Sequence, residues 1–186
     1  MSGNRILAVD DEPGVLQSLK RVFLDEPFEV LTASGADEAL AILKSFPVKV
    51  IISDERMPGT TGAELLTMVK RQYPHIIRMM LAGHAGLDAA MKAINHGEIW
   101  RFFRKPWDNT ELVLSVRAAI DKYDLEAENR RLLDTARKQA VEIRLLEKQF
   151  PGIAALQRDS SGSIIVENIT QEELSAIIEE CQRLFQ

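Results

Sequence analysis

The chain has 186 residues, of which 46% are apolar and 27% are charged, and its formal net charge at pH 7 is −5. This composition excludes a disordered chain, and the length allows one domain of ordinary size with an appendage. No segment approaches the roughly 18 apolar residues that span a bilayer, the first residues do not form a signal peptide, and the single cysteine, Cys181, excludes an intrachain disulfide. We therefore expect a cytoplasmic protein without a membrane segment.

Acidic and basic residues balance over most of the chain but not at its C-terminal end. Residues 150–186 contain six acidic and two basic residues, a balance of −4. A nucleic-acid-binding module normally carries a basic face, because contacts to phosphates supply much of its affinity. The sequence therefore disfavours direct binding of nucleic acid.

Strand-like and helix-like segments alternate through the first 120 residues. The expected strands are residues 5–9, 28–33, 48–53, 76–81 and 100–103. The expected helices are residues 13–24, 35–46 with Ser34 as N-cap, 62–72, 87–95, and a last helix that follows the N-cap Asp108, with Glu111 three residues further on. Five strands that alternate with five helices predict an α/β fold with a five-stranded, doubly wound parallel sheet.

The helix that begins at Asn109 meets no glycine or proline before Pro151, so it is too long for an ordinary surface helix. From Leu125 onwards, candidate core residues recur at alternating steps of four and three, which is the heptad pattern of a coiled coil. This seam consists of Leu125, Asn129, Leu132, Ala136, Gln139, Ile143, Leu146 and Phe150. Because Asn129 falls at an a position, as in parallel two-stranded coiled coils, we expect a homodimer, although Ala136 and Gln139 are weak core residues.

The same pattern divides the chain into three parts. We expect a first domain at 1–120, a coiled-coil helix at 121–150, and a small α/β tail of one strand and one helix at 151–186. The alternative to a dimer is that Leu132, Ile143 and Leu146 fold back onto the first domain or onto the tail of the same chain.

Polar side chains follow three of the expected strands. Asp10 and Asp11 follow the first strand, Asp54 follows the third, and Lys105 follows the fifth. The carboxyl ends of parallel strands are where open α/β sheets place their sites. Carboxylate oxygens suit Mg²⁺, a lysine can bind a phosphoryl oxygen, and an aspartate can act as nucleophile toward a phosphoryl group. The alternative interpretation is that these acids are helix caps and turn residues.

Four segments that contain these residues make the chain resemble the response-regulator receiver domains of bacterial two-component signalling. They are residues 9–12 (VDDE), 54–62 (DERMPGTTG), 81–85 (LAGHA) and 102–107 (FFRKPW). The resemblance covers residue 4 to about residue 120 and implies a flavodoxin-like fold. Residues 96–107 also resemble the receivers that are fused to cyclic-di-GMP phosphodiesterase or hydrogenase-regulator outputs.

The resemblance implies a role for each site residue. Asp54 would accept a phosphoryl group from a sensor histidine kinase, and Lys105 would bind a phosphoryl oxygen. Asp11, Asp54 and the backbone carbonyl of Arg56 would coordinate Mg²⁺, with Asp10 as a further member of the acidic pocket. Phe102 occupies the position of the aromatic switch residue, and Pro106 would follow a cis peptide bond.

Ala82 departs from the family pattern. Receivers normally carry Thr or Ser there, and its hydroxyl group binds a phosphoryl oxygen and draws the following loop inward. Loss of one hydrogen bond to a charged group costs about 1.5–3 kcal/mol, which is comparable with the gap between two conformational states. We expect a weaker switch but not the loss of phosphorylation, unless the backbone amide at this position makes the contact.

Two other functions compete with that of a phosphoacceptor. An aspartate-nucleophile phosphatase of the haloacid dehalogenase type requires a second Asp two residues after the nucleophile, where this chain has Arg56, so we do not expect an enzyme. A degenerate receiver that acts as a phosphorylation-independent dimeric interaction module is the alternative that Ala82 makes possible, although the complete set of Asp10, Asp11, Asp54 and Lys105 argues against it. The output is expected to be a protein–protein interaction or to reside in a further domain of a longer protein.

Overall fold

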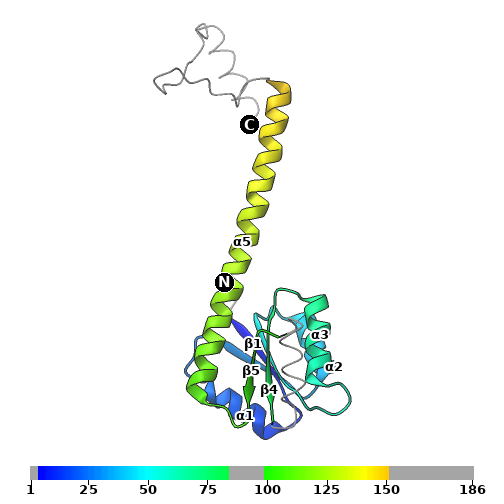
Figure 1. Ribbon diagram of the computed structural model, residues 1–186, viewed down its shortest axis with the longest axis vertical. Coiled ribbons are helices and arrows are strands. Elements are labelled where there is room, and N and C mark those ends of the chain that lie inside the picture. The colour runs from blue at the N-terminus through cyan, green and yellow to red at the C-terminus, as the bar shows by residue number, and fades with distance from the viewer. Residues whose placement is uncertain (1–3, 84–98, 151–186) are drawn as a thin grey trace. The chain divides into compact units, whose positions relative to one another are not determined.

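The computed structural model describes residues 4–83 and 99–150 (Figure 1). Its strands are β1 (Arg5–Val9), β2 (Glu29–Ala33), β3 (Val50–Asp54), β4 (Ile77–Ala82) and β5 (Arg101–Arg104). Its helices are α1 (Pro13–Val22), α2 (Ala36–Ser45), α3 (Gly62–Gln72) and α5 (Asn109–Gln149). These elements confirm the predicted ones within two residues at each end. The helix expected at 87–95 and the tail at 151–186 lie outside the described residues.

All the pairings in the described sheet are parallel, and the strand order is β2-β1-β3-β4-β5. Because β1 lies between β2 and β3, the chain first winds toward one edge of the sheet and then toward the other. This is the order of the flavodoxin-like fold, and it confirms the predicted fold class. It places the carboxyl ends of β1 and β3 side by side at the point where the winding reverses.

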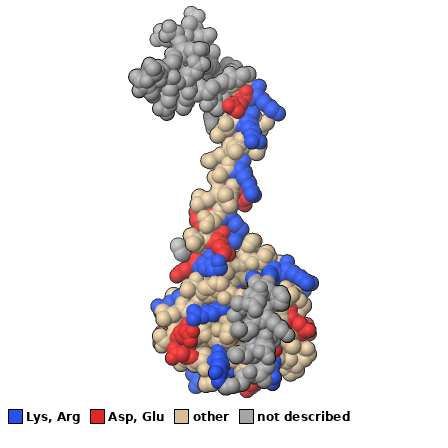
Figure 2. All heavy atoms as spheres, in the orientation of Figure 1, with Lys and Arg blue, Asp and Glu red and all other residues tan. Residues whose placement is uncertain are grey.

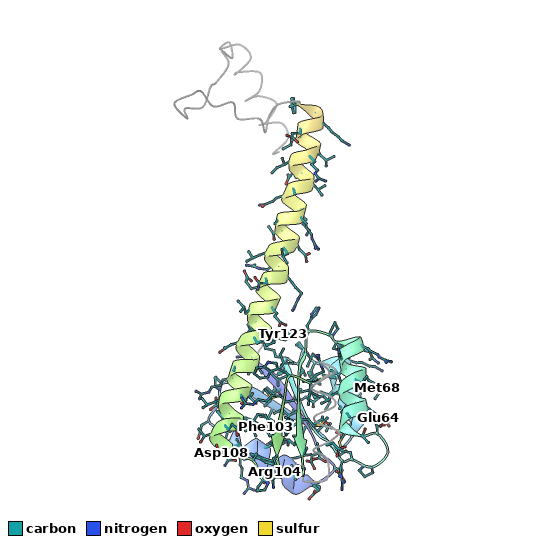
Figure 3. The ribbon with its side chains drawn as sticks, in the orientation of Figure 1. Glu64, Met68, Phe103, Arg104, Asp108 and Tyr123 are labelled. Atoms are coloured by element: carbon teal, nitrogen blue, oxygen red, sulfur yellow. The ribbon has the colours of Figure 1, made fainter. Side chains whose placement is uncertain are left out.

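Helices cover both faces of the sheet, which explains why its central strands are apolar on both sides. On one face, α2 and α3 pack against alternate strand residues that include Leu7, Ile51 and Met80. On the other face, α1 and the first part of α5 pack against the residues between them, including Ile6, Ile52 and Phe103. Figure 3 labels Phe103 on β5, facing α5. Both layers hold β3 fully buried.

The starts of two helices show where local sequence signals succeed and fail. The predicted N-cap Ser34 is wrong, because Gly35 is the N-cap of α2 and no side chain caps that helix. The Ser34 amide and hydroxyl instead donate to Glu38 Oε2, both at 2.7 Å. In α3, Thr61 and Glu64 form a capping box that follows the S/T-x-x-E pattern.

Helix α5 begins as predicted, because Asp108 Oδ1 accepts a hydrogen bond from the Glu111 amide at 2.8 Å. Its buried residues are Leu112, Ser115, Val116, Ala119 and Ile120. Beyond Ile120 its large apolar side chains are exposed, and Figure 2 shows Lys, Arg, Asp and Glu interleaved with other residues along the helix. The chain divides into two compact units, Met1–Arg131 and Leu132–Gln186, with the boundary inside α5.

None of the helices in the described part of the chain has the length and apolar character that crossing a bilayer requires.

Candidate functional site

Two buried carboxylates lie at the carboxyl ends of β1 and β3. Asp10 follows the last residue of β1 and is 0% exposed, whereas Asp54 ends β3 and is 6% exposed. The register pairs Val9 with Ser53, so the two strands end side by side. The parallel pairing of β1 with β3 therefore brings together two acids that are 44 positions apart in the sequence.

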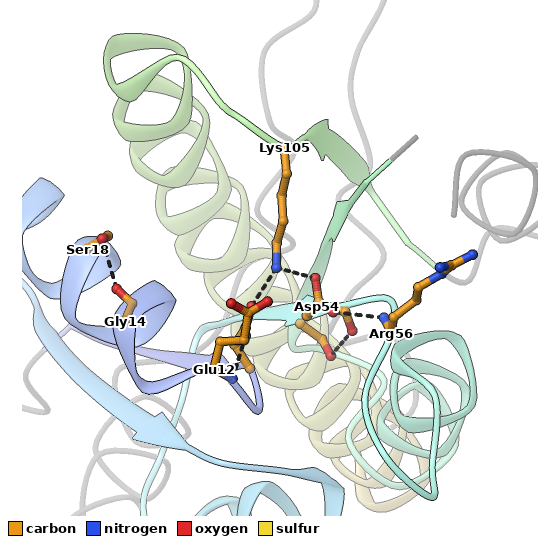
Figure 4. A network of polar contacts seen from close by, with 8 residues as sticks. Glu12, Gly14, Ser18, Asp54, Arg56 and Lys105 are labelled. Atoms are coloured by element: carbon orange, nitrogen blue, oxygen red, sulfur yellow. Dashed lines mark hydrogen bonds and ion pairs between the residues drawn. The ribbon is translucent and has the colours of Figure 1, made fainter. Parts of the chain in front are cut away.

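Lys105 bridges the two acids. Its Nζ lies 2.8 Å from Asp10 Oδ2 and 2.5 Å from Asp54 Oδ1, and its side chain is 23% exposed (Figure 4). The Lys105 amide donates to the carbonyl of Ala82 at 2.9 Å, which continues the sheet beyond β5 and directs the side chain to the site. The Lys105–Pro106 peptide bond is cis, as the resemblance implies.

Each acid also accepts a backbone hydrogen bond. The Glu12 amide donates to Asp10 Oδ1 at 2.9 Å, and the Arg56 amide donates to Asp54 Oδ2 at 2.8 Å. One oxygen of each carboxylate is thus held by the chain immediately after its strand, and the other by the lysine. These contacts fix the orientation of both carboxylates.

Burial and charge act in opposite directions at this site. Burial raises the pKa of the Asp10 carboxyl, although the hydrogen bonds from Lys105 and the Glu12 amide lower it in part. Burial alone would lower the pKa of Lys105, but the hydrogen bonds and negative charges of Asp10 and Asp54 outweigh it, so the pKa is raised. The lysine is therefore held as an ammonium group.

The oxygen donors at this edge of the sheet suit a hard divalent cation. No group of three Asp, Glu, His or Cys side chains among the described residues is arranged to hold a metal ion. Asp10 and Asp54 are the two acids brought together, while the predicted ligand Asp11 is exposed beside them. Mg²⁺ typically binds one or two carboxylates and fills its other positions with water and phosphate oxygens. The donor set fits Mg²⁺ in this way.

The predicted switch residues lie on the last two strands. Ala82 ends β4, is fully buried, and uses its carbonyl to hold the Lys105 amide. Phe102 lies on β5, half-buried, against the core that β1, β3 and β4 form with α2 and α3. No side-chain hydroxyl is present at residue 82 to reach toward Asp54.

Sequence reasoning did not predict the contacts that three residues make at the site. A Cβ atom on Gly62 would lie 1.9 Å from the Asp54 carbonyl oxygen, so only glycine lets α3 begin this close to β3. The Ser53 hydroxyl donates to that same carbonyl at 2.9 Å. Glu55 Oε2 is buried without a hydrogen bond, although Arg56 Nε lies 3.6 Å away. The glycine stands in a visible motif, but nothing local in the sequence states which backbone it approaches.

The family model of the response regulator receiver domain matches residues 6–117. The chain belongs to this family. Receiver domains are signalling domains that accept a phosphoryl group from sensor histidine kinases, and they generally bind Mg²⁺ at the site of phosphorylation. This receiver carries the acidic pair and the lysine that the sequence predicted for that site.

The most similar proteins include a transcription regulator and two solved structures. The hydrogenase transcriptional regulatory protein HoxA of Cupriavidus necator is 40% identical over 127 residues, which are 68% of this chain and 26% of HoxA. A structure titled adenylate cyclase from Rhodopirellula baltica is 39% identical with a TM-score of 0.67, covering 71% of this chain and 98% of that one. The signal receiver domain of an HD domain-containing protein from Pseudomonas fluorescens is 37% identical with a TM-score of 0.65, covering 69% and 94%.

These relatives confirm the predicted subfamily, since a hydrogenase regulator and an HD domain-containing protein both appear among them. The chain spans about a quarter of the length of the curated relatives it matches. Their similarity therefore concerns the receiver.

The close approach of Gly62 to β3 gives a testable prediction. Gly62→Ala should lower the free energy of unfolding by about 1–3 kcal/mol, because the added methyl group forces α3 away from the Asp54 carbonyl. Gly14→Ala in α1 is the matched control, since nothing lies within 4 Å of its added Cβ and alanine favours the helix. Chemical denaturation measures both, and equal stabilities of the two variants would contradict the prediction.

Proposed function

We propose that Asp54 accepts a phosphoryl group from a sensor histidine kinase, in a reaction that requires Mg²⁺ and in which Lys105 assists. The observation that supports this most directly is the bridge from Lys105 to two buried carboxylates at the carboxyl edge of the sheet. A carboxylate held beside a cation, with its second oxygen fixed by the Arg56 amide, is positioned as a nucleophile.

In the proposed reaction, a carboxylate oxygen of Asp54 forms a bond to the phosphorus of a phosphohistidine. The P–N bond breaks, its electron pair stays on the imidazole nitrogen, and an acyl phosphate remains on Asp54. The Lys105 ammonium group lies 2.5 Å from Asp54, so it can bind an oxygen of the transferred phosphoryl group and neutralise part of its charge. Asp10, Asp11, Asp54 and the Arg56 carbonyl would hold Mg²⁺, which supplies further neutralisation of the phosphoryl oxygens.

Ala82 sets a limit on how the phosphorylated state is read. In its relatives' usual arrangement a hydroxyl at this position contacts the phosphoryl group and frees space for the aromatic residue, here Phe102. Without that hydroxyl we expect phosphorylation to shift the conformational equilibrium less strongly. The alternative, a degenerate receiver that works without phosphorylation, is less well supported, because Asp10, Asp54 and Lys105 are all present and in contact.

Phosphotransfer can be tested without the kinase. Intact-mass spectrometry after incubation with acetyl phosphate should show one phosphoryl adduct that depends on Mg²⁺ and disappears in Asp54→Asn. Asp37→Asn, at an exposed position of α2, is the control and should retain the adduct. An Asp54→Asn protein that is still modified to the same extent would remove the assignment.

We further propose that the signal leaves the receiver through α5, with domains at 1–120, 121–150 and 151–186 as the sequence predicts. The exposed fractions of the large apolar seam residues lie between 38% and 66%, so these side chains are available to a second copy. They are Leu125, Leu132, Ile143, Leu146 and Phe150, and Asn129 and Ala136 between them are also exposed. Burial of a Leu or Ile side chain contributes about 1.5–3 kcal/mol, which favours a homodimer, and Asn129 at an a position favours its parallel form.

The negative charge of residues 150–186 continues to disfavour direct binding of nucleic acid in our proposal. HoxA is named a transcriptional regulator, but this chain matches only about a quarter of it, so any transcriptional output belongs to the proposal and not to the match. Location in the cytoplasm also stays a prediction.

Light scattering tests the dimer. At micromolar concentration the wild-type protein should have a mass about twice 20.9 kDa. Leu132→Asp combined with Leu146→Asp should give a folded monomer, because each change places charge in the seam. The control pair Arg130→Asp with Lys148→Asp lies outside the seam and should stay dimeric. A wild-type monomer would refute the model.

A further inference from the structure

A largely buried cation, Lys49, lies just before the amino end of the strand that ends in Asp54. Lys49 immediately precedes β3, and its side chain is 14% exposed. Its backbone joins the three central strands, because the Lys49 amide donates to the Arg5 carbonyl and the Ile77 amide donates to the Lys49 carbonyl, both at 2.9 Å. Lys49 therefore extends the pairing of β3 with β1 and β4 by one residue at the amino end of β3.

The Lys49 side chain reaches α5 at the point where the helix leaves the receiver. Its Nζ lies 2.5 and 2.6 Å from the two carboxylate oxygens of Asp124 and 2.6 Å from Asn4 Oδ1. It also lies 5.8 Å from the centre of the Tyr123 ring, within the range of a cation–π interaction. Figure 3 labels Tyr123 and Asp108 at the two ends of the part of α5 that lies along the receiver. Leu125, which follows Asp124, is the first residue of the proposed seam.

Another cation, Arg78, lies near the amino end of the neighbouring strand β4. Arg78, the second residue of β4, donates to the Ile76 carbonyl at 2.6 Å. Burial lowers the pKa of Arg78, and the negative charge of Glu126 offsets part of this effect. β3 thus ends in Asp54 at its carboxyl end, and Lys49, the residue before its amino end, bonds to Asp124 of α5.

We propose that Lys49 couples phosphorylation of Asp54 to α5. Its contacts with Tyr123 and Asp124 link the amino end of β3 to the turn of α5 at which the helix leaves the receiver. This inference rests on the proposed phosphorylation of Asp54. β3 spans five residues, or about 17 Å, and is buried on both faces, so its two ends move together. The route uses strand ends and so does not require the hydroxyl that residue 82 lacks.

Hydrogen exchange of residues 121–128, measured with and without beryllofluoride and Mg²⁺, tests the proposed coupling through Lys49. In the wild type, beryllofluoride should change exchange in this segment by about fivefold, a typical allosteric coupling. In Lys49→Met this response should disappear, while acetyl phosphate still modifies Asp54. Arg117→Met is the matched control, since it breaks the ion pair of Arg117 with Glu26 on the same helix and should leave the response intact.

A second variant guards against misfolding. Asp124→Asn should reduce the response, and the exchanged pair Lys49→Asp with Asp124→Lys should restore part of it. An unchanged response in Lys49→Met, or a phosphorylated wild type without any response at 121–128, overturns this inference alone. A wild type that acquires no phosphoryl group on Asp54 refutes the proposed function and the inference with it.

Discussion

The ammonium group of Lys105, held between the carboxylates of Asp10 and Asp54, is the interaction on which the arrangement of the site depends. Two buried like charges at neighbouring strand ends repel each other and are costly to remove from water, so they require a cation between them. The sheet order places the acids, the Lys105 amide bonds to the Ala82 carbonyl, and Gly62 lets α3 close against β3. The same negative charge that needs the lysine makes the site suited to Mg²⁺ and a phosphoryl group.

Much of this could be predicted from the sequence, because it depends on local patterns. The spacing of apolar residues predicted the strands and helices, and the position of Asp10 and Asp54 directly after expected strands predicted them as site residues. The cap at Ser34 failed because α2 begins one residue later, with Gly35 as N-cap, and Ser34 instead donates to Glu38. The bonds of Lys49 to Asp124, and the approach of Gly62 to the Asp54 carbonyl, depend on packing between distant segments, which no local pattern encodes.

In our proposal, this receiver differs from the usual family pattern in how it would respond to phosphorylation. Ala82 is buried and has no side-chain hydroxyl, whereas Lys49, next to the amino end of β3, bonds to Asp124 of α5. In our account the sheet itself links the site to the helix, and the exposed apolar seam of α5 is the surface that receives the signal. The proposed route from the acidic pocket through β3 and Lys49 to Asp124 lies within the first unit, Met1–Arg131.

The most direct test of the central interaction is the unfolding free energy of Lys105→Met at pH 7, with and without Mg²⁺. Without Mg²⁺ the variant should be less stable than the wild type by about 1.5–3 kcal/mol, because two buried carboxylates lose a charged hydrogen-bond donor. Saturating Mg²⁺ should stabilise the variant more than the wild type, since the cation then takes over the neutralisation. Lys44→Met, on the exposed end of α2, should behave as wild type. A Lys105→Met protein as stable as the wild type without Mg²⁺, and unaffected by its addition, would contradict the account.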